Sequence, residues 1–245
     1  MGRKRIDLVL VERGLFESRA KARAAIEAGR VEAGGRLVLR RSEMVEEGDP
    51  IAAEPAYPWV GRAALKLDHA LSLWPIPTSG RRVVDIGAST GGFTEVALAR
   101  GAARVLAVDV GRDQLHPKLR GDPRVTSLEG TDARHLRSDQ LGEFDLIVCD
   151  VSFISLTKAL PAVLAAAPPG CDLVCLVKPQ FEVGPDRVGR GGLVRDPEAR
   201  QAALDSAQVF LTDSGWMVRE VAPSPITGGD GNVEFLLWAQ KRPPA

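Results

Sequence analysis

The sequence predicts a two-domain α/β protein, with a small α+β domain followed by a larger Rossmann-like domain. Near the N-terminus, the double glycine Gly34–Gly35 joins two short β-prone runs. From Trp59 onward, β-branched apolar runs alternate with helical segments, which is typical of a parallel sheet covered on both faces. A glycine-rich turn follows the first of these runs. With 245 residues and 44% hydrophobic content, the chain can form both cores.

Two helices are predicted at the start of the first domain, which we place at residues 1–56. The first begins near Ile6 and ends before Gly14, because glycine commonly ends a helix. The hydroxyl of Ser18 can cap the second helix, over Arg19–Ala28. The buried side of this helix is expected to consist of Ala22, Ala25 and Ile26.

Short strands complete the first domain. Val31–Ala33 and Arg36–Val38 flank the double glycine, since both turn positions of a tight hairpin need positive φ. A further strand pair is expected around Glu47–Asp49. The proline-containing residues 57–61 are predicted to be a linker, which leaves residues 62–245 for the larger domain.

In the larger domain, a helix containing Leu65, Leu67 and Leu71 is expected to precede the sheet. The predicted strands at the centre of this sheet are Arg82–Ile86, Val105–Val108, Asp145–Cys149 and Leu173–Val177. After them come a helix around Asp196–Ser214 and two final strands, Trp216–Pro223 and Asn232–Trp238, which we expect to be antiparallel to each other.

The glycine-rich turn predicts a cofactor site. It runs from Gly87 to Phe93 and follows a strand that carries Asp85. Ligands bind at the carboxyl ends of parallel strands, where glycines let the backbone approach closely. The G-x-G-x-x-G pattern of dinucleotide-binding enzymes is broken, because Ser89 stands where the second glycine would be. An acid at the strand end suits a ligand with an amino group, which favours S-adenosylmethionine over NAD.

Three more acids follow predicted strands. Asp109 is placed to accept hydrogen bonds from ribose hydroxyls, and Asp132 from an adenine amino group; Asp150 ends a later strand. Any one of them could instead be a helix cap, but four acids beside one turn favour a ligand site. The predicted cofactor-binding residues are Asp85, Gly87, Ser89, Gly91, Gly92, Phe93, Asp109, Asp132 and Asp150.

Four charged residues attached to apolar segments are candidates for catalysis: Lys66, Asp150, Lys178 and Glu234. Charged groups in such places are costly unless they are paired, and two lysines can pair with two carboxylates. One alternative is a buried ion-pair network without chemistry. Asp150 and Lys178 follow strands at the edge where the cofactor is expected, which favours a catalytic role.

The charges are unevenly distributed. The whole chain has 32 basic and 32 acidic residues, but residues 1–41 contain eleven basic and five acidic ones. Such clustering suits a phosphate backbone, although a solvated helix face would also explain it. The glycine-rich stretch Val183–Leu193 is either a segment that closes over RNA or a plain surface loop. The predicted RNA-binding residues are Arg3, Lys4, Arg5, Arg19, Lys21, Arg23, Arg30, Arg187 and Arg190.

Several motifs resemble known families. Three runs, Arg5–Leu8, Leu15–Ala22 and Ile26–Val31, resemble an S4 domain, an RNA-binding module. The order of the four charged residues is similar to the K-D-K-E tetrad of FtsJ-like ribose 2′-O-methyltransferases. Four motifs further resemble the TlyA family, in which an S4 domain is joined to an FtsJ-like domain. These motifs are Asp150–Leu156, Lys178–Glu182, Val188–Pro197 and Gly231–Leu236.

The resemblance implies a Rossmann-like class I methyltransferase domain behind an S4 domain, with S-adenosylmethionine as cofactor. It further implies methylation of cytidine 2′-hydroxyls in 16S rRNA, 23S rRNA or both, with ribosomal RNA or ribosomal subunits as partners. A ribose hydroxyl must lose its proton during attack, so we assign Lys178 to that position, as base or as fixed positive charge. Asp150 is expected to orient Lys178, while Lys66 and Glu234 position the ribose.

Other features bear on rival classes. The three cysteines lie in or beside apolar runs, so buried thiols are expected rather than disulfides. No metal is expected, because the histidines lack ligand spacing. No segment reaches the ~20 apolar residues of a membrane span, and no signal peptide is recognised, so a cytoplasmic protein is expected. A non-catalytic ribosome-assembly factor, a membrane-active haemolysin and a dehydrogenase are the alternatives; no oligomeric state is predicted.

Overall fold

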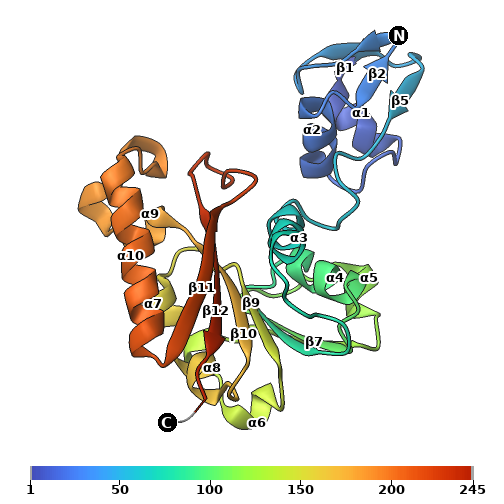
Figure 1. The fold of residues 1–245 in the computed structure, drawn as a ribbon. Helices are drawn as coiled ribbons and strands as arrows, with labels where there is room; N and C mark the ends of the chain where they lie inside the picture. The colour runs from blue at the N-terminus through green and yellow to red at the C-terminus, as the bar shows by residue number, and fades with distance from the viewer. Residues whose placement is uncertain (1, 244–245) are drawn as a thin grey trace. The chain divides into compact units, whose positions relative to one another are not determined.

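The computed structural model describes residues 2–243; Met1 and residues 244–245, the outer bounds of the two predicted domains, lie outside it. The chain divides into two compact units between Pro58 and Trp59 (Figure 1). Val60, part of the predicted linker, is buried in the second unit, where its N–H donates to Glu95 Oε2. The last residues of that segment therefore belong to the second unit.

The two helices of the first unit form as predicted. α1 spans Ile6–Glu12 and α2 spans Arg19–Glu27, and the Ser18 hydroxyl accepts a hydrogen bond from the N–H of Lys21. The predicted inner side of α2 is fully buried against α1. The apolar core of this unit includes Ile6, Val9, Leu10, Ala22, Ala25 and Ile26.

Of the two strand pairs predicted for the first unit, one forms and the other does not. The hairpin of β2 (Val31–Ala33) and β3 (Arg36–Leu37) is confirmed. The predicted pair around Glu47–Asp49 is wrong, because β4 (Met44–Glu46) pairs with β1 (Arg3–Arg5) and β5 (Ile51–Ala53) pairs with β2. In these long-range pairings, Val45 and Ile51 pack against the helical core. The turn residues between two strands do not indicate which distant strand each of them pairs with.

A seven-stranded sheet forms the centre of the second unit, in the order β11-β12-β10-β9-β6-β7-β8 (Figure 1). β8, β7, β6, β9 and β10 are parallel, whereas β12 is antiparallel to both β10 and β11. The predicted strands and the antiparallel final pair are confirmed. Their bounds are β6 Arg82–Ile86, β7 Arg104–Asp109, β8 Val125–Glu129, β9 Leu146–Cys149, β10 Asp172–Val177, β11 Trp216–Pro223 and β12 Phe235–Lys241.

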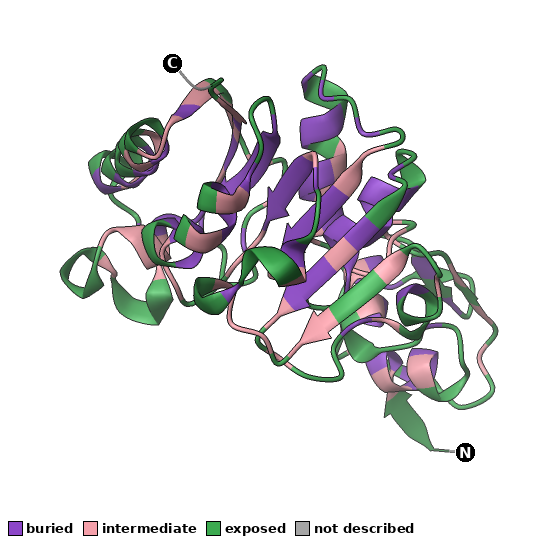
Figure 2. Ribbon diagram, turned by 90° about the horizontal axis from the view of Figure 1, so that it is seen from below, coloured by how far each residue is buried: buried purple, intermediate pink, exposed green. Residues whose placement is uncertain are grey.

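Burial explains why one strand escaped prediction. Every residue of β9 and β10 is buried, as their continuous apolar sequences require. The edge strand β8 contains the exposed Thr126 and Ser127 and was not expected. Figure 2 shows the contrast between the buried central strands and the more exposed edge.

Helices cover both faces of the sheet, as predicted. One core contains α3, α4 and α5, and the other contains α7, α8 and α10 together with the free, buried Cys149, Cys171 and Cys175. The helices are α3 Ala64–Leu73, α4 Gly92–Ala99, α5 Pro117–Arg120, α6 Ser138–Leu141, α7 Leu156–Ala159, α8 Pro161–Ala166, α9 Pro179–Glu182 and α10 Pro197–Asp213. Short 3-10 turns occur at η1 Ala133–His135, η2 Pro185–Arg187 and η3 Arg190–Gly192.

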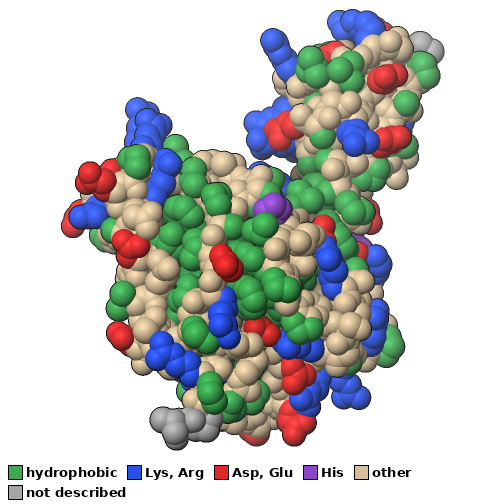
Figure 3. Space-filling model, in the orientation of Figure 1, with side chains coloured by type: hydrophobic (Ala, Val, Ile, Leu, Met, Phe, Trp, Pro, Cys, Tyr) green, Lys and Arg blue, Asp and Glu red, His purple; other side chains and the backbone are tan. Residues whose placement is uncertain are grey.

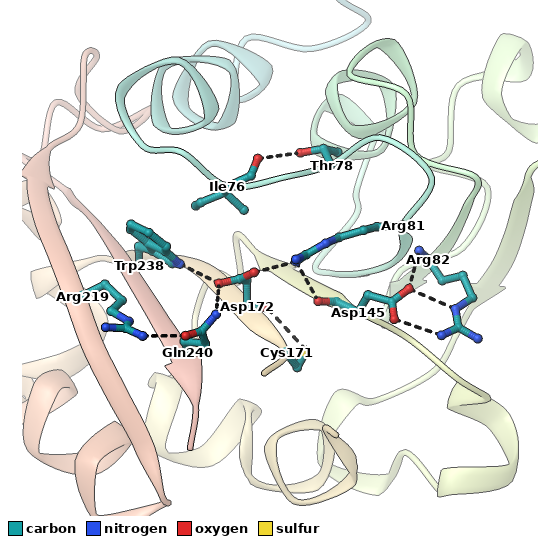
Figure 4. Close-up of polar contacts among 10 residues, drawn as sticks. All are labelled: Ile76, Thr78, Arg81, Arg82, Asp145, Cys171, Asp172, Arg219, Trp238 and Gln240. Atoms are coloured by element: carbon teal, nitrogen blue, oxygen red, sulfur yellow. Dashed lines mark hydrogen bonds and ion pairs between the residues drawn. The ribbon is translucent and has the colours of Figure 1, made fainter. Parts of the chain in front are cut away.

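A buried polar network ties the start of β10 to its neighbours (Figure 4). Asp172 is only 1% exposed, and its carboxylate lies 2.5 Å from the Arg81 guanidinium. The same carboxylate accepts a hydrogen bond of 2.9 Å from the indole N–H of Trp238 on β12. Because the Arg81 guanidinium also donates to the carbonyl of Asp145, three segments are joined at the amino end of the parallel strands.

Candidate active site

A cavity of about 950 Å³ opens at the carboxyl ends of β6, β7 and β9. This is the edge where parallel α/β sheets bind their ligands. Five predicted cofactor residues line it: Gly87, Ser89, Asp109, Asp132 and Asp150.

The glycine-rich turn is shaped to let a ligand approach its backbone. Gly87 has φ +82°, and a Cβ added there would lie 2.9 Å from the carbonyl oxygen of Asp150. Ser89 also has positive φ, at +47°, and its N–H donates to Asp109 Oδ2 over 2.7 Å. Asp109 Oδ1 accepts a second hydrogen bond, from the N–H of Gly111. Asp109 therefore holds two loops of the cavity wall in place.

Four predicted cofactor residues are absent from the described cavity lining: Asp85, Gly91, Gly92 and Phe93. Asp85 is fully buried, and its Oδ2 accepts a hydrogen bond from the Thr94 hydroxyl over 2.7 Å. Burial raises the pKa of Asp85 from 3.8 to about 7, against the opposing effect of the Thr94 hydrogen bond. Asp85 thus supports the turn from behind rather than lining the cavity.

The other three support the helix that follows the turn. A Cβ on Gly92 would lie 3.1 Å from the backbone nitrogen of Ala64, so Gly92 lets α4 pack closely on α3. Gly91 has φ +94° and precedes α4, and Phe93 is buried in the core on that face of the sheet. Sequence alone did not distinguish residues that line the cavity from those that pack behind it.

Asp132 lines the cavity but already has a partner. Its carboxylate accepts hydrogen bonds from the backbone N–H and the guanidinium of Arg134, which also lines the cavity. The Arg134 side chain is the main reason that the pKa of Asp132 is lowered to about 2. Asp132 therefore stays ionised, and Arg134 is a cavity residue that the sequence analysis missed.

The structure brings the four predicted catalytic residues together. Glu234 Oε2 lies 2.5 Å from Lys66 Nζ, and Lys66 Nζ lies 4.0 Å from Asp150 Oδ2. Asp150 Oδ1 in turn lies 2.6 Å from Lys178 Nζ. The side chains are between 2% and 11% exposed, so these alternating charges lie in a desolvated environment.

Different elements position these four side chains. Lys66 is on α3, Asp150 follows β9 directly, and Lys178 caps α9 directly after β10. Glu234 directly precedes β12, which begins at Phe235, so the predicted strand Asn232–Trp238 began too early and Glu234 is not part of the observed strand. Of the four, Asp150 alone is among the described residues that line the cavity.

Phe153 is a cavity residue to which the sequence analysis assigned no role. It has φ +65° and is 89% exposed, the largest exposed fraction among the large hydrophobic residues that the structure describes. Its ring lies 5.3 Å from that of Phe181, and both rings line the cavity. An exposed phenylalanine in a left-handed conformation is a signal visible only in three dimensions.

The seven predicted RNA-binding residues of the first unit all form ion pairs. Figure 3 shows blue and red side chains interspersed on this unit. The pairs are Arg3–Glu46, Lys4–Glu12, Arg5–Asp7, Arg19–Asp7, Lys21–Glu17, Arg23–Glu27 and Arg30–Glu54. The five pairs with glutamates lie at the surface and are weak, so those basic residues can exchange partners, whereas Arg5 and Arg19 share the buried Asp7.

A second set of exposed arginines forms no ion pair within residues 2–243. Arg36, Arg40 and Arg41 follow the double glycine of the first unit. Arg187 and Arg190 lie on η2 and η3 of the glycine-rich stretch, which contains short helical turns rather than lacking structure. Unpaired guanidinium groups are the most available partners for an anion.

Comparison with known proteins assigns both units. Residues 59–241 match the FtsJ-like methyltransferase family and residues 4–51 match the S4 domain. The chain is also 46% identical to the 16S/23S rRNA (cytidine-2′-O)-methyltransferase TlyA of Mycobacterium tuberculosis H37Rv, over 96% of this chain and 89% of the relative. The chain belongs to the TlyA family of FtsJ-like methyltransferases.

Other TlyA-family relatives have a different name. Hemolysin A of Brachyspira hyodysenteriae is 38% identical over 95% of this chain and 98% of its own length. The solved structure of a Streptococcus thermophilus protein described as a hemolysin is 38% identical, with a TM-score of 0.78 over 99% of this chain and 90% of that one. In residues 2–243, no helix has the length and apolarity that crossing a bilayer demands.

Family membership makes the chain a methyltransferase and implies S-adenosylmethionine as the methyl donor. The cavity residues fit that molecule. A glycine without room for a side chain forms one wall, and the acidic residues Asp109, Asp132 and Asp150 line the cavity, which suits a ligand that carries amino, hydroxyl and sulfonium groups. Among the described residues, no cluster of three or more His, Cys, Asp or Glu could hold a metal ion.

Proposed function

We propose that this protein methylates the ribose 2′-hydroxyl of cytidines in 16S rRNA, 23S rRNA or both. The Mycobacterium tuberculosis relative is named for both RNAs, and a Campylobacter jejuni relative, 37% identical over 74% of this chain, is named for 23S rRNA. Ribosomal RNA or a ribosomal subunit is the macromolecular partner, and the cytoplasm is the place of action. The observation that carries the proposal is the buried series Glu234–Lys66–Asp150–Lys178 beside the cavity.

Lys178 is the proposed catalytic residue. Its Nζ lies 2.6 Å from Asp150 Oδ1 in an ion pair and donates a hydrogen bond to the Ser152 hydroxyl. This arrangement favours a fixed ammonium group that stabilises the oxyanion developing on the attacking ribose, rather than a base. Asp150 orients Lys178, while Lys66 and Glu234 neutralise and hold Asp150 from the other side. Direct contact of Lys66 or Glu234 with the ribose, our expectation from sequence, has less support, because neither lines the cavity.

The cavity residues would hold the methyl donor. S-adenosylmethionine supplies an electrophilic methyl group that needs orientation more than activation. Asp109 is proposed to accept hydrogen bonds from its ribose hydroxyls, and Asp132 from its adenine amino group. Gly87 and Ser89 would give it close access to the backbone.

Two surfaces are proposed to bind the RNA. The unpaired Arg36, Arg40 and Arg41 would contact phosphates from the S4 unit, together with the seven basic residues predicted from the sequence. On the methyltransferase unit, Arg187 and Arg190 would do the same. The exposed ring of Phe153 beside the cavity suits stacking on an unpaired base.

Methyl transfer to isolated ribosomal subunits tests the proposal. The wild-type chain should transfer labelled methyl groups from S-adenosylmethionine to one or both subunits, and mapping of methylated riboses should find a cytidine. A wild-type chain that binds rRNA but transfers no methyl group would support the assembly-factor alternative instead.

The variant Lys178→Ala should lower kcat by about 100-fold or more, because it removes the positive charge beside the developing oxyanion. Binding of S-adenosylmethionine, measured by calorimetry, should change less than about threefold, since Lys178 is not among the described cavity residues. Thermal denaturation serves as the control, because the variant leaves Asp150 with a weaker set of partners. Undiminished turnover would contradict the role of Lys178.

A further inference from the structure

The ammonium group of Lys178 has one ion-pair partner and one hydrogen-bond acceptor. Asp150 Oδ1 lies 2.6 Å from Nζ, and Ser152 Oγ lies 2.8 Å from it. A lysine ammonium has three N–H donors in a tetrahedral arrangement. Ser152 Oγ is the one atom among the described residues that accepts a hydrogen bond from Nζ, so this bond sets the direction of the ammonium group.

Asp150 by itself could not fix that direction. Its Oδ1 accepts no hydrogen bond within the described residues, so its ion pair with Nζ attracts the charge without orienting the N–H bonds. The other oxygen of Asp150 faces Lys66, 4.0 Å away, so it does not orient Lys178 either. Within the described residues, only Ser152 orients the ammonium group through a hydrogen bond.

The place of Ser152 in the fold suits this task. It lies two residues after Asp150, in the segment between β9 and α7, so the end of one buried strand carries both partners of Lys178. Ser152 is exposed and lines the cavity, whereas Lys178 is 7% exposed and lies behind it. The hydroxyl thus holds Lys178 from the side on which the substrate would bind.

We propose that Ser152 is a positioning residue for methyl transfer, which fixes the Lys178 ammonium so that its positive charge stays directed at the acceptor oxygen. The inference rests on the proposed function of Lys178. Without the hydroxyl, Lys178 is held by Asp150 alone, and its charge is no longer aimed at the place where negative charge develops. The effect belongs to the chemical step rather than to binding.

The test compares Ser152→Ala with Ser152→Thr, which keeps a hydroxyl at the same carbon. Ser152→Ala should lower kcat by about 10- to 100-fold, the range for a lost hydrogen bond to a charged group. The KM for ribosomal subunits and the Kd of S-adenosylmethionine should stay within about twofold, because only the reacting geometry is disturbed. Ser152→Thr should restore kcat to within about threefold of wild type.

Thr157→Ala is the matched control. It removes an exposed hydroxyl five residues later, one that is hydrogen-bonded to Ser155 rather than to Lys178. Its kcat should equal that of the wild type. If Ser152→Ala proves unstable on heating, Ser152→Cys replaces it, because a thiol has similar size and is a much weaker acceptor; a similar fall in kcat is then expected.

Three results would overturn the inference. The first is a wild-type kcat in Ser152→Ala or Ser152→Cys. The second is an increase in KM alone, which would make Ser152 an RNA contact. The third is a folded Ser152→Thr that remains as slow as Ser152→Ala. If the wild type itself transfers no methyl group, the proposed function fails and this inference with it, whereas an active wild type beside an equally active Ser152→Ala removes the inference only.

Discussion

Gly87 occupies a position at the cavity edge where a side chain has no room. Two separate penalties would act on a substitution there: the positive φ of +82°, and the 2.9 Å approach of an added Cβ to the carbonyl of Asp150. Asp150 is the first residue after β9 and also faces both lysines of the tetrad. A shift of its backbone would therefore disturb both the cofactor cavity and the alternating charges.

Gly87→Ala should lower stability by about 1–3 kcal/mol and weaken S-adenosylmethionine binding by about tenfold or more. Gly170→Ala is the control, because Gly170 has nearly the same φ, +78°, but open space around its Cβ position. It should lose about 1 kcal/mol of stability without a change in cofactor affinity. Urea denaturation and calorimetry measure the two effects. Equal loss of affinity in both variants would refute the steric explanation.

Asp85 should make stability depend on pH. Its pKa is about 7 in the folded protein and 3.8 ordinarily, so the folded state binds the proton more tightly. The associated stability is fully present below pH 3.8 and is lost as pH rises toward 7. Between pH 5 and pH 8, the free energy of unfolding of the wild type should fall by up to about 3 kcal/mol relative to that of Asp85→Asn. Parallel curves from urea denaturation would contradict this.

Among the elements, the strands show which features can be predicted from local sequence and which cannot. The apolar sequences of β9 and β10 can only be central strands, and both were predicted. β8 was not predicted, because Thr126 and Ser127 face solvent at the sheet edge. β4 and β5 were predicted as strands but assigned to each other, since their true partners β1 and β2 are distant in sequence.

The buried polar network around Asp172 joins the antiparallel β12 to the parallel part of the sheet. Asp172→Ala should lower the free energy of unfolding by about 3–5 kcal/mol, because it removes one partner of a buried ion pair and leaves Arg81 and the Trp238 indole without their acceptor. Asp139→Ala, which breaks an exposed pair with Arg137, should cost less than about 1 kcal/mol.

Urea denaturation measures both losses, and methyl transfer at low temperature provides a second readout. Transfer should be preserved in folded Asp172→Ala, because Asp172 begins β10 whereas Lys178 follows the opposite end of that strand. A loss of stability no larger than that of Asp139→Ala would mean that the network contributes little.

For the whole molecule, the net charge does not reveal the proposed RNA-binding surfaces, because 32 basic residues balance 32 acidic ones. The ion pairs in the structure divide the basic residues of the first unit into two groups. The seven predicted in the first unit are in ion pairs, whereas three arginines after the double glycine are not. Those three should therefore contribute most directly to phosphate binding.

Replacement of Arg36, Arg40 and Arg41 by alanine should weaken rRNA binding and reduce the slope of log Kd against log salt by about 2–3, since each phosphate contact releases counterions. The control replaces Arg104, Arg124 and Arg137 by alanine, which removes the same charge from the methyltransferase unit, outside the cavity lining. Fluorescence titration at several salt concentrations measures both. An equal change in the two variants would indicate a general effect of charge.

Sequence by itself predicted a small and a larger unit, the helices α1, α2, α3 and α10, the central strands and the four charged residues that the fold brings together, because burial and charge leave patterns along the chain. Tertiary structure alone decided which residues line the cavity. Asp85 and Phe93 share a motif with Gly87 and Ser89 but pack behind it, whereas Ser152 and Phe153 reach the cavity from a segment after β9. The direction of a side chain depends on φ, ψ and neighbours far away in sequence, which local patterns do not encode.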